Sequence, residues 1–182
     1  MKKSFILVVL FYCWVFSLCA FSEDRKVTLY NQAVEEHTKG NLDKAEELYN
    51  EVISEDDNFF LAKYNLAKIY TDKKKYDNAI TLLNSIPEDE KQNIFLVKKT
   101  IGTIYYIRGD LKKAKKIFED LNKTNPELYE PYFHLGLIYE KKKSFKRAKE
   151  NFKKAVELKP DLAEAHHHLD ILNLVLNKKD EE

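Results

Sequence analysis

The chain has 182 residues, 44% of them hydrophobic, which is enough for one compact domain or a short array of repeats. With four Gly and four Pro, it has too few turn residues for a β-sandwich or a disordered linker protein. The net charge is only +1, and the basic residues are nearly all Lys, whereas bidentate contacts to phosphate favour Arg. The composition therefore argues against a nucleic-acid-binding protein.

Residues 1–22 have the features of a secretion signal. Lys2 and Lys3 give a positively charged start, and residues 5–18 form a run of 14 residues that is apolar apart from Ser17. A membrane span needs about 20 apolar residues, so a cleaved signal peptide fits this run better than a transmembrane helix.

The residues after this run suggest where the signal peptide is cleaved, and they leave two alternatives to simple cleavage open. Ala20 and Ser22 fit an Ala-x-Ser site that would leave Glu23 as the first mature residue, with cleavage after Ala20 as the alternative. Extending the apolar run to Phe21 gives 17 residues, the lower limit for a span, so an uncleaved membrane anchor stays open. A lipoprotein modified at Cys19 stays open as well.

Both cysteines, Cys13 and Cys19, lie in this N-terminal segment. A mature chain without cysteine has no disulfide, no thiol nucleophile and no thiolate ligand for a metal. Such a chain is compatible with an oxidising compartment, and we expect it in the bacterial periplasm or cell envelope.

A repeat with a period of 34 or 35 residues dominates the rest of the sequence. Its clearest copy reads Tyr132-x2-Leu135-Gly136-x2-Tyr139, followed by Ala148-x3-Phe152-x2-Ala155 and Pro160. The same columns recur as Ile101-Gly102-x2-Tyr105 with Ala114-x3-Phe118, as Leu66-Ala67-x2-Tyr70 with Ala79-x3-Leu83, and as Gln32-Ala33 with Ala45-x3-Tyr49. Agreement in several columns over four copies is not expected by chance.

This pattern resembles the tetratricopeptide repeat in its period and in its large, Leu-Gly, Tyr, Ala, Phe and Pro columns. The resemblance implies an all-α fold, a right-handed α-solenoid of about four helical hairpins with a C-terminal capping helix. The predicted segments are a signal peptide or membrane anchor (1–22), four repeats (26–59, 60–94, 95–128, 129–162), a capping helix (163–177) and a charged tail (178–182).

Periodicity supports the hairpins independently, because each copy divides into two amphipathic stretches separated by a polar turn. Gly40 and Gly109 suit the left-handed conformation that ends a helix. The turns at 73–75 and 141–144 have no glycine, so we expect them to be strained or differently closed. Pro87 comes early in its copy and predicts a longer connection over 88–93.

Small residues let the helices approach closely at Ala33, Ala67, Gly102 and Gly136, and at Ala45, Ala79, Ala114 and Ala148.

In the tetratricopeptide family, the first helix of each hairpin lines a concave groove that holds a partner's peptide or helix. Applied to this sequence, the resemblance predicts partner-binding residues at Tyr30, Val34, Tyr64, Asn65, Lys68, Lys99, Tyr106, Phe133 and Leu137. Rigid aromatic side chains are good interface anchors. The alternative is that several of them pack against the neighbouring hairpin. The family's clamp for a C-terminal carboxylate is not matched, because Tyr30, Val34 and Thr103 stand where it needs Lys, Asn and a basic residue.

Charge is unevenly distributed along the chain. Residues 23–60 carry a net charge of −7 and residues 95–162 a net charge of +8. The simplest interpretation is a solvated surface, and the alternatives are self-association or docking on an acidic partner or an anionic lipid surface.

No pattern indicates catalysis or a cofactor. His166, His167 and His168 are consecutive, and since helical neighbours point about 100° apart, they cannot all bind one metal ion from a regular helix. No phosphate-binding glycine loop, nucleophile motif or metalloprotease motif occurs. We therefore expect a non-enzymatic, exported module that binds a protein or peptide and no nucleic acid. The alternative is a structural or assembly subunit of a membrane complex in the cell envelope, with membrane association through the N-terminus.

Overall fold

A computed structural model describes residues 25–87 and 91–180 of the chain. The predicted signal peptide, with Cys13 and Cys19, and the last two residues lie outside these ranges. The described residues form helices and no strand, and within each of the two units described below, helices that follow one another in the chain pack together, which confirms the predicted all-α class. The chain divides into two compact units, Met1–Pro87 and Glu88–Glu182, which we describe in turn.

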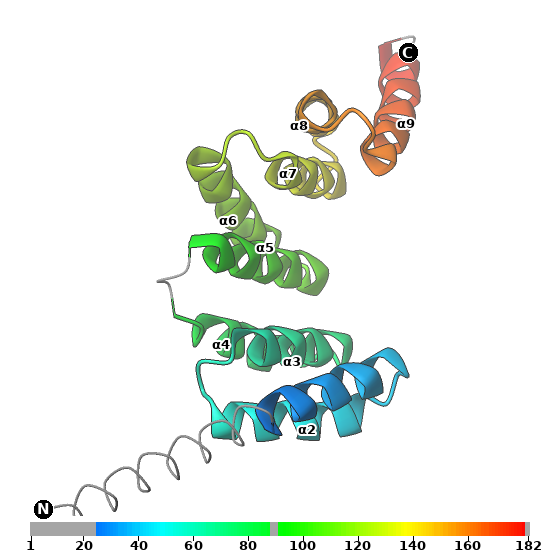
Figure 1. The fold of residues 1–182 in the computed structure, drawn as a ribbon. Helices are drawn as coiled ribbons and strands as arrows, with labels where there is room; N and C mark the ends of the chain where they lie inside the picture. The colour runs from blue at the N-terminus through cyan, green and yellow to red at the C-terminus, as the bar shows by residue number, and fades with distance from the viewer. Residues whose placement is uncertain (1–24, 88–90, 181–182) are drawn as a thin grey trace, which may run out of the picture. The chain divides into compact units, whose positions relative to one another are not determined.

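The first unit contains two helical hairpins (Figure 1). A helix over residues 25–38 precedes α2 (Leu42–Glu55), and α3 (Phe60–Asp72) precedes α4 (Tyr76–Asn84). Ala33 and Ala45 are fully buried, as the predicted close approach of the first two helices requires. The ring of Tyr49 and the side chains of Val52 and Leu66 complete this core.

The second unit contains two more hairpins and a final helix. These are α5 (Lys91–Arg108) with α6 (Leu111–Thr124), α7 (Tyr129–Lys141) with α8 (Phe145–Leu158), and α9 (Ala163–Asp180). Buried Phe118 and Phe152 are at the centres of its two core clusters. The helix α9 covers α8 on one side and leaves Ile171 and Leu174 exposed, the latter by 72%. It runs to Asp180, so the first residues of the predicted tail are helical.

The turns within the four hairpins close in one way, whether or not they contain glycine. Gly40 and Gly109 have φ of 82° and 95°, while Lys74 and Lys143 take the same left-handed region with φ of 58° and 57°. Each turn also has one backbone bond that spans five residues, from Asn41 N to Glu36 O, Lys75 N to Tyr70 O, Asp110 N to Tyr105 O and Ser144 N to Tyr139 O. The expectation of different closure is therefore wrong. Among the described residues, backbone strain from a positive φ is confined to these two lysines, at about 1–2 kcal/mol each.

The connection near Pro87 begins and ends earlier in the chain than the sequence suggested, at residues 85–90. The helix α4 has 9 residues where α2, α6 and α8 have 14, and Ile86 is buried after it. We predicted a connection over 88–93, yet α5 begins at Lys91. Residues 91–94 include no Pro or Gly, so nothing in their backbone stops the helix from starting early.

We predict that Gly136→Ala destabilises the protein, because the added Cβ would lie only 2.6 Å from Phe152 Cε1. The Phe152 ring is fully buried, so its close-packed neighbours limit how far it can move. Such overpacking costs about 1–3 kcal/mol, partly offset by the better helix propensity of Ala. Urea unfolding measures the loss. In a Phe152→Leu chain the same substitution should cost less, and equal costs in the two backgrounds would contradict the proposed clash.

Candidate functional site

In the first unit, the first helices of the two hairpins meet around Tyr30. Its ring lies 5.2 Å from the ring of Phe59 and 6.0 Å from that of Tyr49, measured between centroids. Asn65 Nδ2 donates a hydrogen bond of 3.1 Å to the Tyr30 hydroxyl, and Val34 packs on the same core. The structure therefore brings these three predicted site residues together, in contacts that hold α3 against the first hairpin.

A second group on α3 remains accessible. Leu61, Tyr64 and Lys68 are spaced by three and four residues, so they lie along one side of the helix. Leu61 is 48% exposed and Lys68 is exposed, while half-buried Tyr64 stacks on Phe60 with 5.7 Å between ring centroids. This stripe, which we call the α3 stripe, combines an apolar, an aromatic and a cationic side chain at the surface.

In the second unit, Lys99 and Tyr106 connect α5 to α7. Lys99 Nζ lies 3.6 Å from Glu130 Oε1 and 5.6 Å from the centre of the Phe95 ring. Lys141 Nζ stands 4.9 Å above the ring of Tyr106. Burial, and secondarily the charge of Glu140, raises the pKa of Tyr106 above its usual value. These two predicted residues therefore already have intramolecular partners.

Phe133 and Leu137 belong to the interface of α7 with α8 and α9. The ring of Phe133 lies 5.7 Å from that of Phe152 and 6.2 Å from that of His168. Leu137 is half-buried against the same cluster. Contacts between neighbouring helices therefore explain the positions of most of the aromatic residues that were predicted to bind a partner. Tyr64, in the α3 stripe, is the clearest exception.

Sequence reasoning missed a second repeated feature, in which a histidine stacks on the core phenylalanine. His134 lies 4.4 Å from Phe118 with 10° between the ring planes, and His168 lies 4.8 Å from Phe152 at 11°. Each histidine follows its phenylalanine by sixteen residues, and the two pairs are one repeat apart. This spacing could have indicated the stacking from the sequence. In the sequence, however, His168 was considered only as a possible metal ligand together with His166 and His167.

The two histidines differ in their polar surroundings. Burial, with a smaller contribution from the charge of Lys99, lowers the pKa of His134 to about 4. Its Nδ1 atom is buried without a hydrogen-bond partner in the described structure. His168 Nδ1 lies 2.8 Å from Glu140 Oε2, in a direction unsuited to a hydrogen bond.

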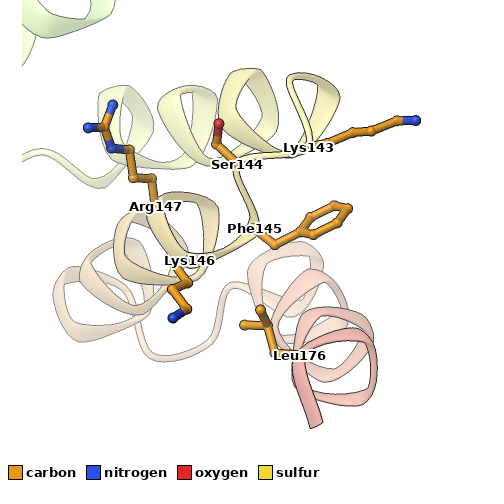
Figure 2. A pocket seen from close by; sticks show the side chains of 6 residues that line it. All are labelled: Lys143, Ser144, Phe145, Lys146, Arg147 and Leu176. Atoms are coloured by element: carbon orange, nitrogen blue, oxygen red, sulfur yellow. The ribbon is translucent and has the colours of Figure 1, made fainter. Parts of the chain in front are cut away.

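A pocket of about 310 Å³ opens at the start of α8 (Figure 2). It lies between the turn that joins α7 to α8 and one residue of α9, Leu176, whose side chain faces the turn in Figure 2. Its other lining residues are Lys143, Ser144, Phe145, Lys146 and Arg147. None of these was among the predicted site residues.

Two features are absent from the described residues. No helix among them is both long and apolar enough to cross a bilayer. Within the same ranges, no three His, Cys, Asp or Glu side chains are grouped so that they could hold a metal ion. His166 Nε2 lies 2.8 Å from the Pro160 carbonyl oxygen, and His167 is exposed.

Stacked helical hairpins with a small-residue contact in each define an all-α repeat protein of the class used for protein interaction. Models of the tetratricopeptide repeat match residues 37–100 and 129–162, together more than half of the chain. The chain is therefore a tetratricopeptide repeat protein.

Solved structures agree on the fold. MamA from Desulfovibrio magneticus RS-1 superposes with a TM-score of 0.69 at 21% identity, covering 85% of this chain and 86% of that one. The Pseudomonas aeruginosa protein pilF gives a TM-score of 0.70 at 18% identity, covering 88% and 71%. A tetratricopeptide repeat protein from Parabacteroides merdae gives 0.70 at 22%, covering 86% and 62%. Among curated proteins, no sequence is significantly similar to this chain.

We predict that His134 makes stability depend on pH. Its pKa falls from 6.5 to about 4 on folding, so the unfolded chain binds a proton more readily between these values. Stability is then complete above pH 6.5 and declines as the pH falls toward 4, by roughly 2–3 kcal/mol in total. Urea unfolding at several pH values should show a shallower decline for His134→Gln. His167→Gln, an exposed control, should keep the wild-type slope; equal slopes for all three proteins would contradict the assignment.

Proposed function

We propose that this protein is a non-enzymatic interaction module that binds an extended peptide or a helix of a partner protein on the first helices of its hairpins. The single observation that supports this most directly is the α3 stripe. Leu61 exposes 48% of its surface although it is a large apolar residue, and Tyr64 and Lys68 lie beside it along the helix. Burial of such a stripe by a partner would release water from apolar surface and leave the lysine for a polar contact.

The chemistry of the stripe suggests the kind of partner. Leucine and tyrosine favour an apolar anchor residue, and the lysine favours a carboxylate or a backbone carbonyl next to it. We infer that the bound segment is an apolar peptide with at least one acidic residue. Tyr30 and Asn65 would support the site from below through their hydrogen bond rather than touch the partner.

Export is the second part of the proposal. Lys2, Lys3 and the apolar run over residues 5–18 support a signal peptide, which would deliver the module to the periplasm or cell envelope. The partner would then be another exported or membrane protein.

We expect Tyr64→Ala to weaken peptide binding at least tenfold, since aromatic hot spots contribute about 2 kcal/mol or more. Peptides selected from a random displayed library against the wild-type protein provide the ligand, and fluorescence polarisation gives its Kd. Leu61→Ser should weaken binding in the same direction.

The matched control is Tyr76→Ala, a half-buried tyrosine at the start of the second helix α4. It should leave the Kd unchanged. Lys113 and Lys116 are exposed on the second helix α6, outside the proposed binding surface on the first helices of the hairpins. Binding that survives both α3 substitutions, but is lost on reversing Lys113 and Lys116 to Glu, would instead favour the assembly-subunit function.

We predict that the mature protein begins at Glu23, because Ala20 and Ser22 fit the cleavage site. Intact-mass measurement of the protein from cell envelopes tests this directly. A mass that includes Met1 would indicate an anchor, and a lipid-modified chain beginning at Cys19 would indicate a lipoprotein; either result contradicts soluble export.

A further inference from the structure

The turn between α7 and α8 concentrates positive charge. Five of the seven residues from Lys141 to Arg147 are basic, and all five of these side chains are exposed. Lys141 and Arg147 approach the rings of Tyr106 and Tyr139, at 4.9 Å and 5.8 Å. Such contacts leave the charge itself uncompensated. In the described structure no carboxylate pairs with any of the five. We call these five residues the α7–α8 cationic surface.

The equivalent turn of the first unit shows what this position looks like when it is neutralised. Lys73 lies 2.5 Å from both Asp43 Oδ1 and Glu46 Oε2 of α2, and Lys75 lies 3.9 Å from Glu46 Oε1. Two repeats later, Lys142 replaces Lys73, while Lys112 and Lys115 replace the two acidic residues. The left-handed Lys74 and Lys143 occupy matching places, which fixes this register. The acidic partners at this scaffold position are thus replaced by lysines, of which Lys115 pairs with Glu119 of its own helix at 3.0 Å while Lys142 has no carboxylate within ion-pair distance in the described structure.

The cations at this turn are present despite unfavourable local energetics. Lys143 adopts φ of 57°, where Gly109 and Gly40 serve in other turns without the strain of a side chain. Neighbouring like charges also repel each other, and none of the five is in an ion pair with a described carboxylate. An external anionic partner would remove the repulsion, so the charge fits a binding role better than a structural one.

The arrangement of the side chains indicates the shape of the partner. Lys143, Lys146 and Arg147 point away from one another in Figure 2, so they do not converge on one phosphate or carboxylate. Between them, half-buried Phe145 lines the 310 Å³ pocket together with Leu176. Separate exposed cations beside an aromatic ring suit a surface with many negative charges and an apolar layer beneath them.

We propose that the α7–α8 cationic surface docks on the anionic phospholipid surface of a membrane, with Phe145 at the depth of the headgroups. This site is separate from the α3 stripe, and neither depends on the other. It would hold the second unit at a membrane even after removal of residues 1–22.

The test is vesicle co-sedimentation of the full chain carrying Lys142→Gln and Lys146→Gln. Vesicles of equal parts phosphatidylglycerol and phosphatidylcholine are compared with vesicles of phosphatidylcholine alone. The ratio of the two partition coefficients is the readout, because any contribution of residues 1–22 is the same in the wild type and in the variants. Each lysine near an anionic bilayer contributes about fivefold, so we expect the ratio to fall roughly 25-fold and to fall with added salt in the wild type.

The matched control is Lys39→Gln with Lys44→Gln, which removes the same charge from exposed lysines that are paired with Glu35, Glu36 and Glu47. This control should keep the wild-type ratio. An equal fall in both double variants would show a dependence on net charge alone and would overturn the assignment. A wild-type ratio near one would also overturn it.

A local readout separates lipid from protein partners. In a Trp14→Phe chain, Phe145→Trp places the only tryptophan at the pocket, and its emission should shift to shorter wavelength with the anionic vesicles alone. A chain that binds soluble polyglutamate through Lys142 and Lys146, with no shift on vesicles, would assign the surface to an acidic protein instead and would overturn the membrane proposal.

Discussion

The contact between a glycine on the first helix and a phenylalanine ring on the second is the constraint on which both hairpins of the second unit depend. At Gly136 an added Cβ would come within 2.6 Å of the Phe152 ring, and at Gly102 within 2.8 Å of the Phe118 ring. Because the rings are fully buried, the helix axes can approach only where the side chain is absent. Each ring also stacks on a histidine of the helix that follows it, His134 of α7 on Phe118 and His168 of α9 on Phe152, so one aromatic ring contacts three helices.

This arrangement explains why so many of the aromatic residues on first helices turned out to be structural. A hairpin cannot bury its apolar side alone, and stacking on a neighbour supplies the missing cover. Phe133 and Tyr30 contribute to that cover, which leaves fewer side chains for a partner than the sequence alone suggested. A residue such as Leu61, outside these contacts, is more informative about binding because folding does not explain its position.

The fold could be predicted well from the sequence, since period, small-residue columns and turns are local and repeat four times. The match of a repeat model to residues 129–162 has the same bounds as the fourth predicted repeat. Side-chain contacts between hairpins could not be predicted with the same success, because they depend on rotamers and on residues far apart in the chain. The stacking of His134 on Phe118 and the pairing of Lys73 with Asp43 and Glu46 are such contacts. Closure at Lys74 and Lys143 was missed for another reason: the hydrogen bonds of the turn outweigh the preference of lysine for negative φ.

The helix α9 has a consequence for any redesign of this array. Its outer side exposes Ile171 and Leu174, so apolar surface for another helix is already in place. Asp170, however, occupies the position that Gly136 has in α7, one repeat earlier. In an added hairpin helix, a phenylalanine ring that packed on position 170 as Phe152 packs on Gly136 would contact the Asp170 carboxylate. The ring would bury this carboxylate without a polar partner. Lengthening the array by a grafted second helix would therefore require glycine or alanine at position 170 first.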